Sequence, residues 1–136
     1  ELGYSQPLPL GFGVQANYTY LDSETPEGLP IPGNSENTYN LIGYYENFGF
    51  GARIAYFWQD EALNTATGFG GRPEYTSDRG QLDASINYDV NDYLSLTLSG
   101  SNLLQEGERS YVQIEERLLL AQQFDRTIAF SVRGRF

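Results

Sequence analysis

The chain has 136 residues, with 18 acidic side chains against 8 basic ones, and it contains no cysteine and no histidine. The net charge of -10 argues against a nucleic-acid partner, which would require a basic surface. Without Cys or His there can be no disulfide, no thiolate metal site and no Ser-His or Cys-His catalytic pair, so we expect neither an enzyme nor a resident cofactor.

Aromatic residues and turn formers dominate the composition, with 11 Tyr, 8 Phe and 15 Gly. Aromatic side chains suit pleated strands and glycine suits turns, so the composition predicts an all-β fold. A transmembrane helix needs about 18 or more consecutive apolar residues, and the sequence has no such run. A membrane-spanning strand needs an apolar side chain only at every second position, so the membrane stays open as an environment.

Six segments alternate between apolar and polar side chains with a period of two. Their lengths approach the roughly 9–11 residues with which a tilted strand crosses a bilayer. In chain order the segments are 10–21, 37–46, 50–60, 80–90, 93–103 and 126–136. The clearest of them sets Leu82, Ala84 and Ile86 on one face and Asp83 and Ser85 on the other.

The connections alternate strictly between short and long. Asn47-Phe48-Gly49 and Asn91-Asp92 consist of residues that suit hairpin turns, because Asn, Asp and Gly tolerate positive φ. The long connections are 22–36, 61–79 and 104–125. This order predicts an antiparallel up-and-down meander of about six long strands, with short turns at one end and long loops at the other, as in outer-membrane barrels.

Two stretches of the long loops have features of their own. The segment 115–124 carries the triplet Leu118-Leu119-Leu120, and we expect irregular or helical structure there, with an extended strand as the alternative. The glycine-rich segment 68–72 lacks the strand-to-helix context of a phosphate-binding loop and is typical of a mobile loop.

Carboxylates gather in the same loops. Asp22, Glu24 and Glu27 form one group, and Asp60 and Glu61 form another. Oxygen ligands on a flexible loop suit calcium, but the spacing of an EF-hand is absent and acidic loops are commonly just solvated. We therefore predict no metal site.

Aromatic side chains lie near the ends of the apolar rows, where an amphipathic ring could sit at a membrane interface. These residues are Phe12, Tyr20, Tyr45, Trp58 and Tyr88.

Charged side chains within the alternating segments fall on the polar phase. They include Arg53, Asp83, Arg133 and Arg135. A charge facing lipid costs roughly 2–4 kcal/mol near the midplane of the bilayer, so we predict that these four residues face a lumen.

Several blocks resemble the C-terminal end of a TonB-dependent outer-membrane receptor. The run 80–90 resembles the antepenultimate strand of that family, and 94–104, with its Asn102-Leu103 pair, resembles the penultimate strand. The stretch 29–35 followed by 39–41 is similar to a loop and the strand after it. The last residues resemble the assembly signal of outer-membrane barrels, with alternating Phe130, Val132, Gly134 and Phe136.

The resemblance implies a nutrient importer for a siderophore, a carbohydrate or a similar ligand. Such receptors have a plug and a barrel of about 22 strands, so residues 1–136 would be the C-terminal portion and the closing part of the barrel, with no plug domain and no signal peptide. The implied partners are outer-membrane lipid, the barrel-assembly machinery, the remaining barrel and plug, and an energy-coupling protein that acts through the plug. The implied location is the bacterial outer membrane.

Two alternatives remain open. The chain begins with Glu1 rather than Met, which suggests a piece of a longer protein or a processed product. A released fragment with exposed strand edges could self-associate outside the cell into a cross-β filament. A soluble β-sandwich, with its apolar rows turned against each other, is the other alternative.

Overall fold

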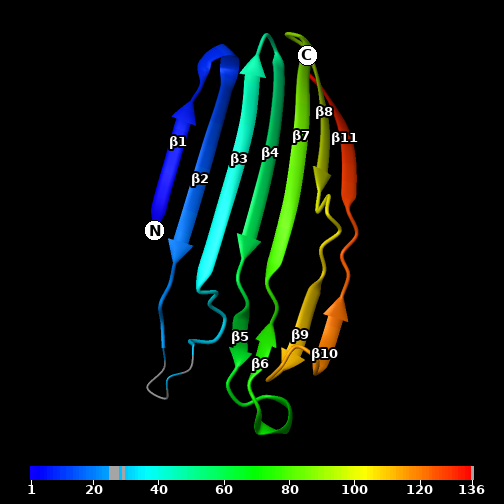
Figure 1. Cartoon of the computed structure of the whole chain (residues 1–136). Coiled ribbons are helices and arrows are strands. Elements are labelled where there is room, and N and C mark those ends of the chain that lie inside the picture. The colour runs from blue at the N-terminus through cyan, green and yellow to red at the C-terminus, as the bar shows by residue number, and fades with distance from the viewer. Residues whose placement is uncertain (25–27, 29, 136) are drawn as a thin grey trace.

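Seven strands form one antiparallel sheet in the computed structural model, which describes residues 1–24, 28 and 30–135 (Figure 1). Their spatial order is β1-β2-β3-β4-β7-β8-β11. Their bounds are Leu2–Pro7 for β1, Phe12–Tyr20 for β2, Asn37–Asn47 for β3, Phe50–Gln59 for β4, Arg79–Asn91 for β7, Leu94–Ser101 for β8 and Thr127–Gly134 for β11. The predicted all-β antiparallel meander is confirmed, and the sheet is open rather than closed into a barrel.

The sequence pattern did not reveal β1. This strand has only 6 residues and ends on Pro7, which lacks the N–H that a central strand would need. Within the described residues β1 pairs with β2 alone, so the proline lies on an edge strand, where its missing donor is tolerated.

The tight turns lie at one end of the main sheet and the long connections at the other, as predicted (Figure 1). The β1–β2 turn contains the short 3-10 helix η1 (Pro9–Gly11), and Phe48-Gly49 and Asp92-Tyr93 form the other two tight turns. Arg135 lies beside the Asp92-Tyr93 turn, since its N–H donates to the Tyr93 carbonyl at 2.9 Å. The C-terminal end of β11 therefore lies at the end of the tight turns.

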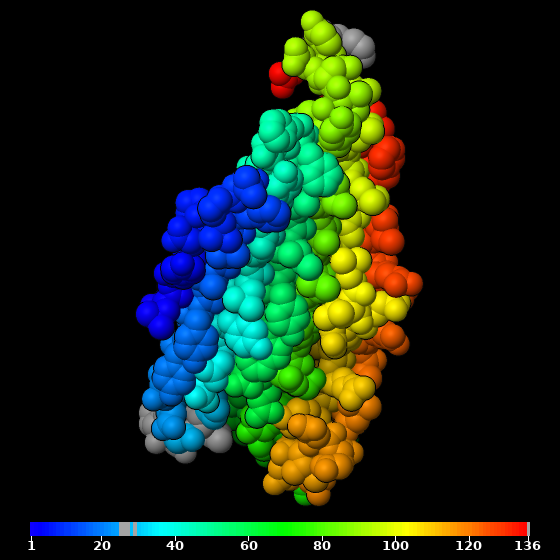
Figure 2. All heavy atoms as spheres, turned by 45° about the horizontal axis from the view of Figure 1, so that its top comes forward, coloured from blue at the N-terminus to red at the C-terminus, as the bar shows by residue number. Residues whose placement is uncertain are grey.

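The long connections contain a second sheet, which the sequence pattern missed. Its order is β10-β9-β6-β5, and its strands are β5 (Ala62–Thr65), β6 (Glu74–Thr76), β9 (Glu108–Val112) and β10 (Leu118–Gln122). This order repeats that of β11-β8-β7-β4, so each short strand prolongs the main strand next to it in the chain. We call these four strands the extension sheet. Figure 2 shows the segment around 104–122, in yellow to orange, gathered at the end away from the tight turns.

The expectation of irregular or helical structure over 115–124 was wrong for 118–122, whereas 115–117 form a turn and 123–124 are irregular. Leu118–Gln122 is strand β10, because the leucine triplet pairs with β9 through Leu118 opposite Tyr111 and Leu120 opposite Ser110. The glycine-rich segment forms the short 3-10 helix η2 (Phe69–Gly71), and the Gly68 N–H donates to the Arg72 carbonyl at 2.8 Å.

The register of the main sheet aligns the apolar residues of neighbouring strands in rows. Ile86 lies opposite Ala52 on one side and Leu98 on the other, and Leu98 in turn lies opposite Phe130. Ile86, Leu98 and Phe130 are exposed, and Phe130 is 65% exposed. The apolar rows therefore do not pack against a second layer, which removes the sandwich alternative for the described residues.

The buried apolar core belongs to the extension sheet. Among the described residues, the buried hydrophobic side chains are Leu63, Tyr111 and Val112. No helix in the described part of the chain is long and apolar enough to cross a membrane.

Candidate functional site

The polar face of the main sheet carries the charged residues that the sequence placed there. Arg53 lies opposite Ser85, Asp83 opposite Ala55, and Arg133 opposite Ser95. Residues directly opposite each other, and residues two apart on one strand, lie on the same face of a sheet. Arg53, Asp83 and Arg133 are connected by such steps through Ser85, Ser99 and Ser95, so they share one face. Arg135 follows the end of β11, two residues after Arg133. That this face looks into a lumen remains a prediction.

A hollow of about 460 Å³ lies on this polar face. Arg53 and Asp83 line it together with the small side chains Ala55, Ser85, Ser99, Ser101, Thr127 and Ala129. Short side chains on β7, β8 and β11 create the space, and the two opposite charges lie on adjacent strands at its side. Among the described residues, the ion pair found is Arg79–Glu108 at 3.4 Å, so Arg53 and Asp83 do not pair with each other.

The residues of the predicted assembly signal lie along the outer apolar row of β11. Phe130 is opposite Leu98, Val132 opposite Leu96, and Gly134 opposite Leu94. Phe130 and Val132 are exposed on the edge strand of the described sheet. Phe136 lies outside the described residues.

The extension sheet is held together by an aromatic pair. The rings of Tyr75 and Tyr111 stack with centroids 5.6 Å apart and planes inclined by 21°. The Tyr111 hydroxyl donates a hydrogen bond to Glu61. Burial, followed by this hydrogen bond, raises the pKa of Tyr111 above its ordinary value, so the phenol stays protonated.

The connection after β2 folds onto the extension sheet. The Gly33 N–H donates to the Leu63 carbonyl at 2.7 Å, and the Ser35 hydroxyl donates to the Asp60 carbonyl at 2.9 Å. A smaller hollow of about 170 Å³ opens beside these contacts. Its lining includes the carboxylates of Asp22, Glu24, Glu36, Asp60 and Glu61.

The two carboxylate groups considered for calcium do not form an ion site in the part of the chain that the structure describes. No three acidic side chains there are close enough together to hold a metal. Asp60 instead accepts hydrogen bonds from the Asn37 amide at 3.1 Å and the Glu61 N–H at 3.0 Å, so it organises the loop. Glu27 lies outside the described residues.

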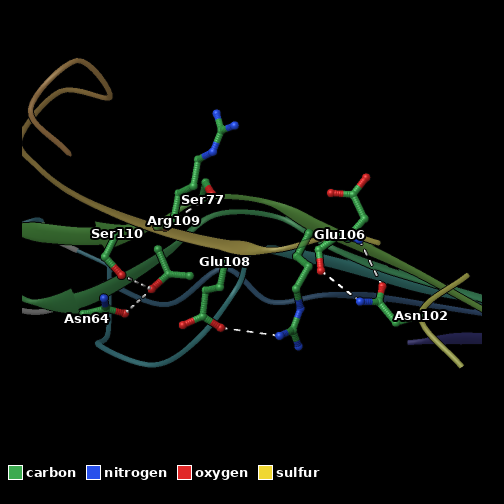
Figure 3. A network of polar contacts seen from close by, with 9 residues as sticks. Asn64, Ser77, Asn102, Glu106, Glu108, Arg109 and Ser110 are labelled. Carbon is green, nitrogen blue, oxygen red and sulfur yellow. Dashed lines mark hydrogen bonds and ion pairs between the residues drawn. The ribbon is translucent and has the colours of Figure 1, made fainter. Parts of the chain in front are cut away.

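Asn102 lies at the junction between the main sheet and the extension sheet, and Figure 3 shows its two side-chain contacts with Glu106. It follows β8 directly and has a positive φ of 50°, which asparagine tolerates better than most residues. Its side-chain amide donates to the carbonyls of Glu106 at 3.1 Å and Phe124 at 2.9 Å. Its side-chain oxygen accepts from the Glu106 N–H at 3.1 Å. One side chain thus joins the β8–β9 connection to the β10–β11 connection.

Asp83 links this junction to the polar face. Its carboxylate accepts the Asn102 N–H at 2.9 Å and the Gln81 amide at 3.1 Å. The sequence pattern placed Asp83 on the correct face but gave no sign of this contact, because the two residues are 19 positions apart. The Asn102-Leu103 pair was the available signal, although its role depends on partners that only the fold brings near.

The family model for "TonB dependent receptor-like, beta-barrel" matches residues 1–103. The matched range contains β1 to β8 and ends within the β8–β9 connection, next to Asn102. No curated protein and no solved structure matches the chain. The Leu29 of the resembling stretch before β3 lies outside the described residues.

Proposed function

This chain belongs to the TonB-dependent receptor β-barrel family, and from that premise we propose that it is the closing, C-terminal part of the barrel of an energised nutrient importer. The family is one of outer-membrane transporters rather than enzymes, and the chain is a barrel segment of such a receptor. We propose a siderophore, a carbohydrate or a similar scarce nutrient as the imported ligand.

The two-faced main sheet carries this proposal. One face presents exposed apolar rows, and Leu41, Ile54, Ile86 and Leu98 are each between 45% and 51% exposed. The opposite face carries hydroxyls, amides and the charges of Arg53, Asp83 and Arg133. A barrel wall needs this division, because one side meets hydrocarbon and the other meets a polar lumen.

The proposed partners follow from the two faces. Lipid covers the apolar rows, and the receptor's plug meets the polar face that includes Arg53, Asp83, Arg133 and Arg135. The energy-coupling protein acts through that plug. The barrel-assembly machinery reads Phe130, Val132, Gly134 and Phe136 at the end of the chain.

Cysteine labelling along β7 tests the proposal in the full receptor in outer membranes. The chain itself has no cysteine, so each substituted cysteine is the single one among residues 1–136. Cysteines at Ser85 and Asn87 should react with a water-soluble maleimide, whereas cysteines at Ala84 and Ile86 should react only with a membrane-soluble one. Equal labelling of all four positions by the water-soluble reagent would contradict a wall that separates lipid from lumen.

A second candidate is self-assembly of the isolated fragment. Within the described residues β1 pairs only with β2 and β11 pairs only with β8, so both edges of the main sheet are open to further strands. In water the isolated chain would then stack edge to edge, with a fibre repeat of about 4.7 Å. A detergent-requiring monomer without that repeat would exclude this candidate.

A further inference from the structure

The β9–β10 hairpin is joined to the main sheet by connections rather than by continuous strand pairing. Residues 102–107 separate β8 from β9, and residues 123–126 separate β10 from β11. The described strand ladders form two separate sheets on either side of these connections. The direction of the hairpin relative to the barrel wall depends on the pairing of β9 with β6, on the Arg79–Glu108 ion pair and on the contacts within the two connections.

Asn102 supplies the contacts that join both connections. Its amide group reaches Glu106 within its own connection and Phe124 within the other, at 3.1 and 2.9 Å. The Asn102 side-chain oxygen also accepts the Glu106 N–H at 3.1 Å, so it closes a compact turn. Loss of this side chain would remove the Asn102 partner of the Phe124 carbonyl and of the backbone N–H and carbonyl of Glu106.

Asp83 fixes the backbone from which this side chain projects. Its carboxylate accepts the Asn102 N–H at 2.9 Å, and the neighbouring Leu103 N–H donates to the Leu82 carbonyl at 2.8 Å. Hydrogen bonds to a charged acceptor are stronger than neutral ones. Asp83 also lines the hollow on the polar face, so the chain of contacts runs from that face to the hairpin.

We propose that Asp83 and Asn102 act together as positioning residues that hold the β9–β10 hairpin over the barrel wall. Their contacts link the polar face to the hairpin and act alongside the pairing of β9 with β6. This inference rests on the proposed function only in taking the polar face as the lumen side of the barrel wall.

Amide hydrogen exchange on the full receptor in detergent tests the pair. Asp83→Ala should raise exchange over residues 102–126 by about tenfold or more, as expected for the loss of a hydrogen bond to a charged group. Asp83→Asn should restore most of the protection, because its side-chain oxygen can still accept the Asn102 N–H. Ser85→Ala, on the same face of β7, is the matched control and should leave exchange unchanged.

Asn102→Gly distinguishes the contribution of the Asn102 side chain from that of its backbone N–H. Glycine keeps the positive φ and the N–H that Asp83 accepts, and it removes only the bonds to Glu106 and Phe124. It should raise exchange over 104–126 by about as much as Asp83→Ala, and the double variant should add little to either single change. Migration of the unheated receptor on a gel shows whether each variant has folded.

Three results would overturn the inference: wild-type exchange in Asn102→Gly, an equal rise throughout β7 and β8 in Asp83→Ala, or no rescue by Asp83→Asn. Each of these can occur while cysteine labelling still alternates along β7, so failure of the inference is distinguishable from failure of the proposed function.

Discussion

Phe48 lies at the tip of the β3–β4 turn, 92% exposed and with a positive φ of 50°. The next residue, Gly49, has a φ of 74°, so both turn residues are left-handed, as in the hairpin turns that favour Asn-Gly. A bulky side chain is strained in this conformation, and the exposed ring of Phe48 gains little from packing to offset the strain.

Replacing Phe48 with Asn should therefore stabilise the hairpin by about 1 kcal/mol, because asparagine tolerates the left-handed region. Urea unfolding of the receptor in lipid vesicles measures the change. Gly49→Ala is the matched control and should destabilise the hairpin, since an added Cβ would lie 3.3 Å from the Asp89 carbonyl oxygen at a positive φ. Destabilisation by Phe48→Asn would show that the ring makes a contact that the strain argument omits.

Tyr111 should lose its proton at a higher pH in the folded protein than in the unfolded chain. Burial and the Glu61 hydrogen bond raise the pKa of Tyr111, whereas an unfolded tyrosine ionises near pH 10. Its contribution to folding is complete below about pH 10 and is lost as the pH rises through the folded pKa, since only the unfolded chain gains by ionising in between.

Spectrophotometric titration of wild type against Tyr111→Phe measures the ionisation of Tyr111. The difference between the two proteins should titrate above about pH 10 for as long as the extension sheet remains folded. A difference that titrates near pH 10 would mean that Tyr111 is solvated and that its contact with Glu61 does not persist.

At the scale of the elements, β2 and β3 are matched through a glycine and an aromatic ring. Gly13 lies directly opposite Tyr44, and the Tyr44 ring occupies the space where a Cβ on residue 13 would lie. The absence of a side chain on one strand thus accommodates the large ring of its neighbour, an arrangement that pins the register of the pair.

Gly13→Ala should destabilise the receptor by about 1–2 kcal/mol, because the Tyr44 ring must move aside. In a Tyr44→Ala background the same change should have almost no effect, so a double-mutant cycle measures a coupling between the two positions. Urea midpoints of the four proteins give this coupling. Additive effects would mean that the ring does not rely on the space above Gly13.

At the scale of the whole molecule, a charged substitution should destabilise the barrel wall on the face that meets lipid and be tolerated on the face that meets the polar lumen. Leu98 and Thr97 are neighbours on β8, but Leu98 belongs to the apolar rows and Thr97 to the polar face. Leu98→Arg should destabilise the inserted receptor by about 2–4 kcal/mol if it lies near the midplane, and Thr97→Arg should have a much smaller effect.

Refolding of both variants into lipid vesicles, followed by urea unfolding, compares the two positions. Leu98→Ala controls for the loss of the apolar side chain alone. Similar destabilisation by the two arginine variants would indicate that the two faces of the sheet meet similar surroundings, and it would contradict the barrel-wall assignment.

The sequence by itself determined the six long strands, their antiparallel order and the face on which each of their side chains lies. It could do so because strand periodicity is local: alternation over 80–90 assigns Ile86 and Asp83 to opposite faces before any partner strand is known. The places of the tight turns were readable from Asn, Asp and Gly, although the positive φ of the β3–β4 turn falls on Phe48 and Gly49 rather than on Asn47.

Only the tertiary structure decided what lies beyond the ends of the long strands. The extension sheet pairs Glu74–Thr76 with β9, more than 30 residues further along the chain, and strands of 3 to 5 residues are too short to show a period of their own. The leucines of β10 resembled a helical turn until β9 was placed beside them. Asp83 and Asn102 meet because their strands pair, and a hydrogen bond between distant residues leaves no pattern in the sequence around either of them.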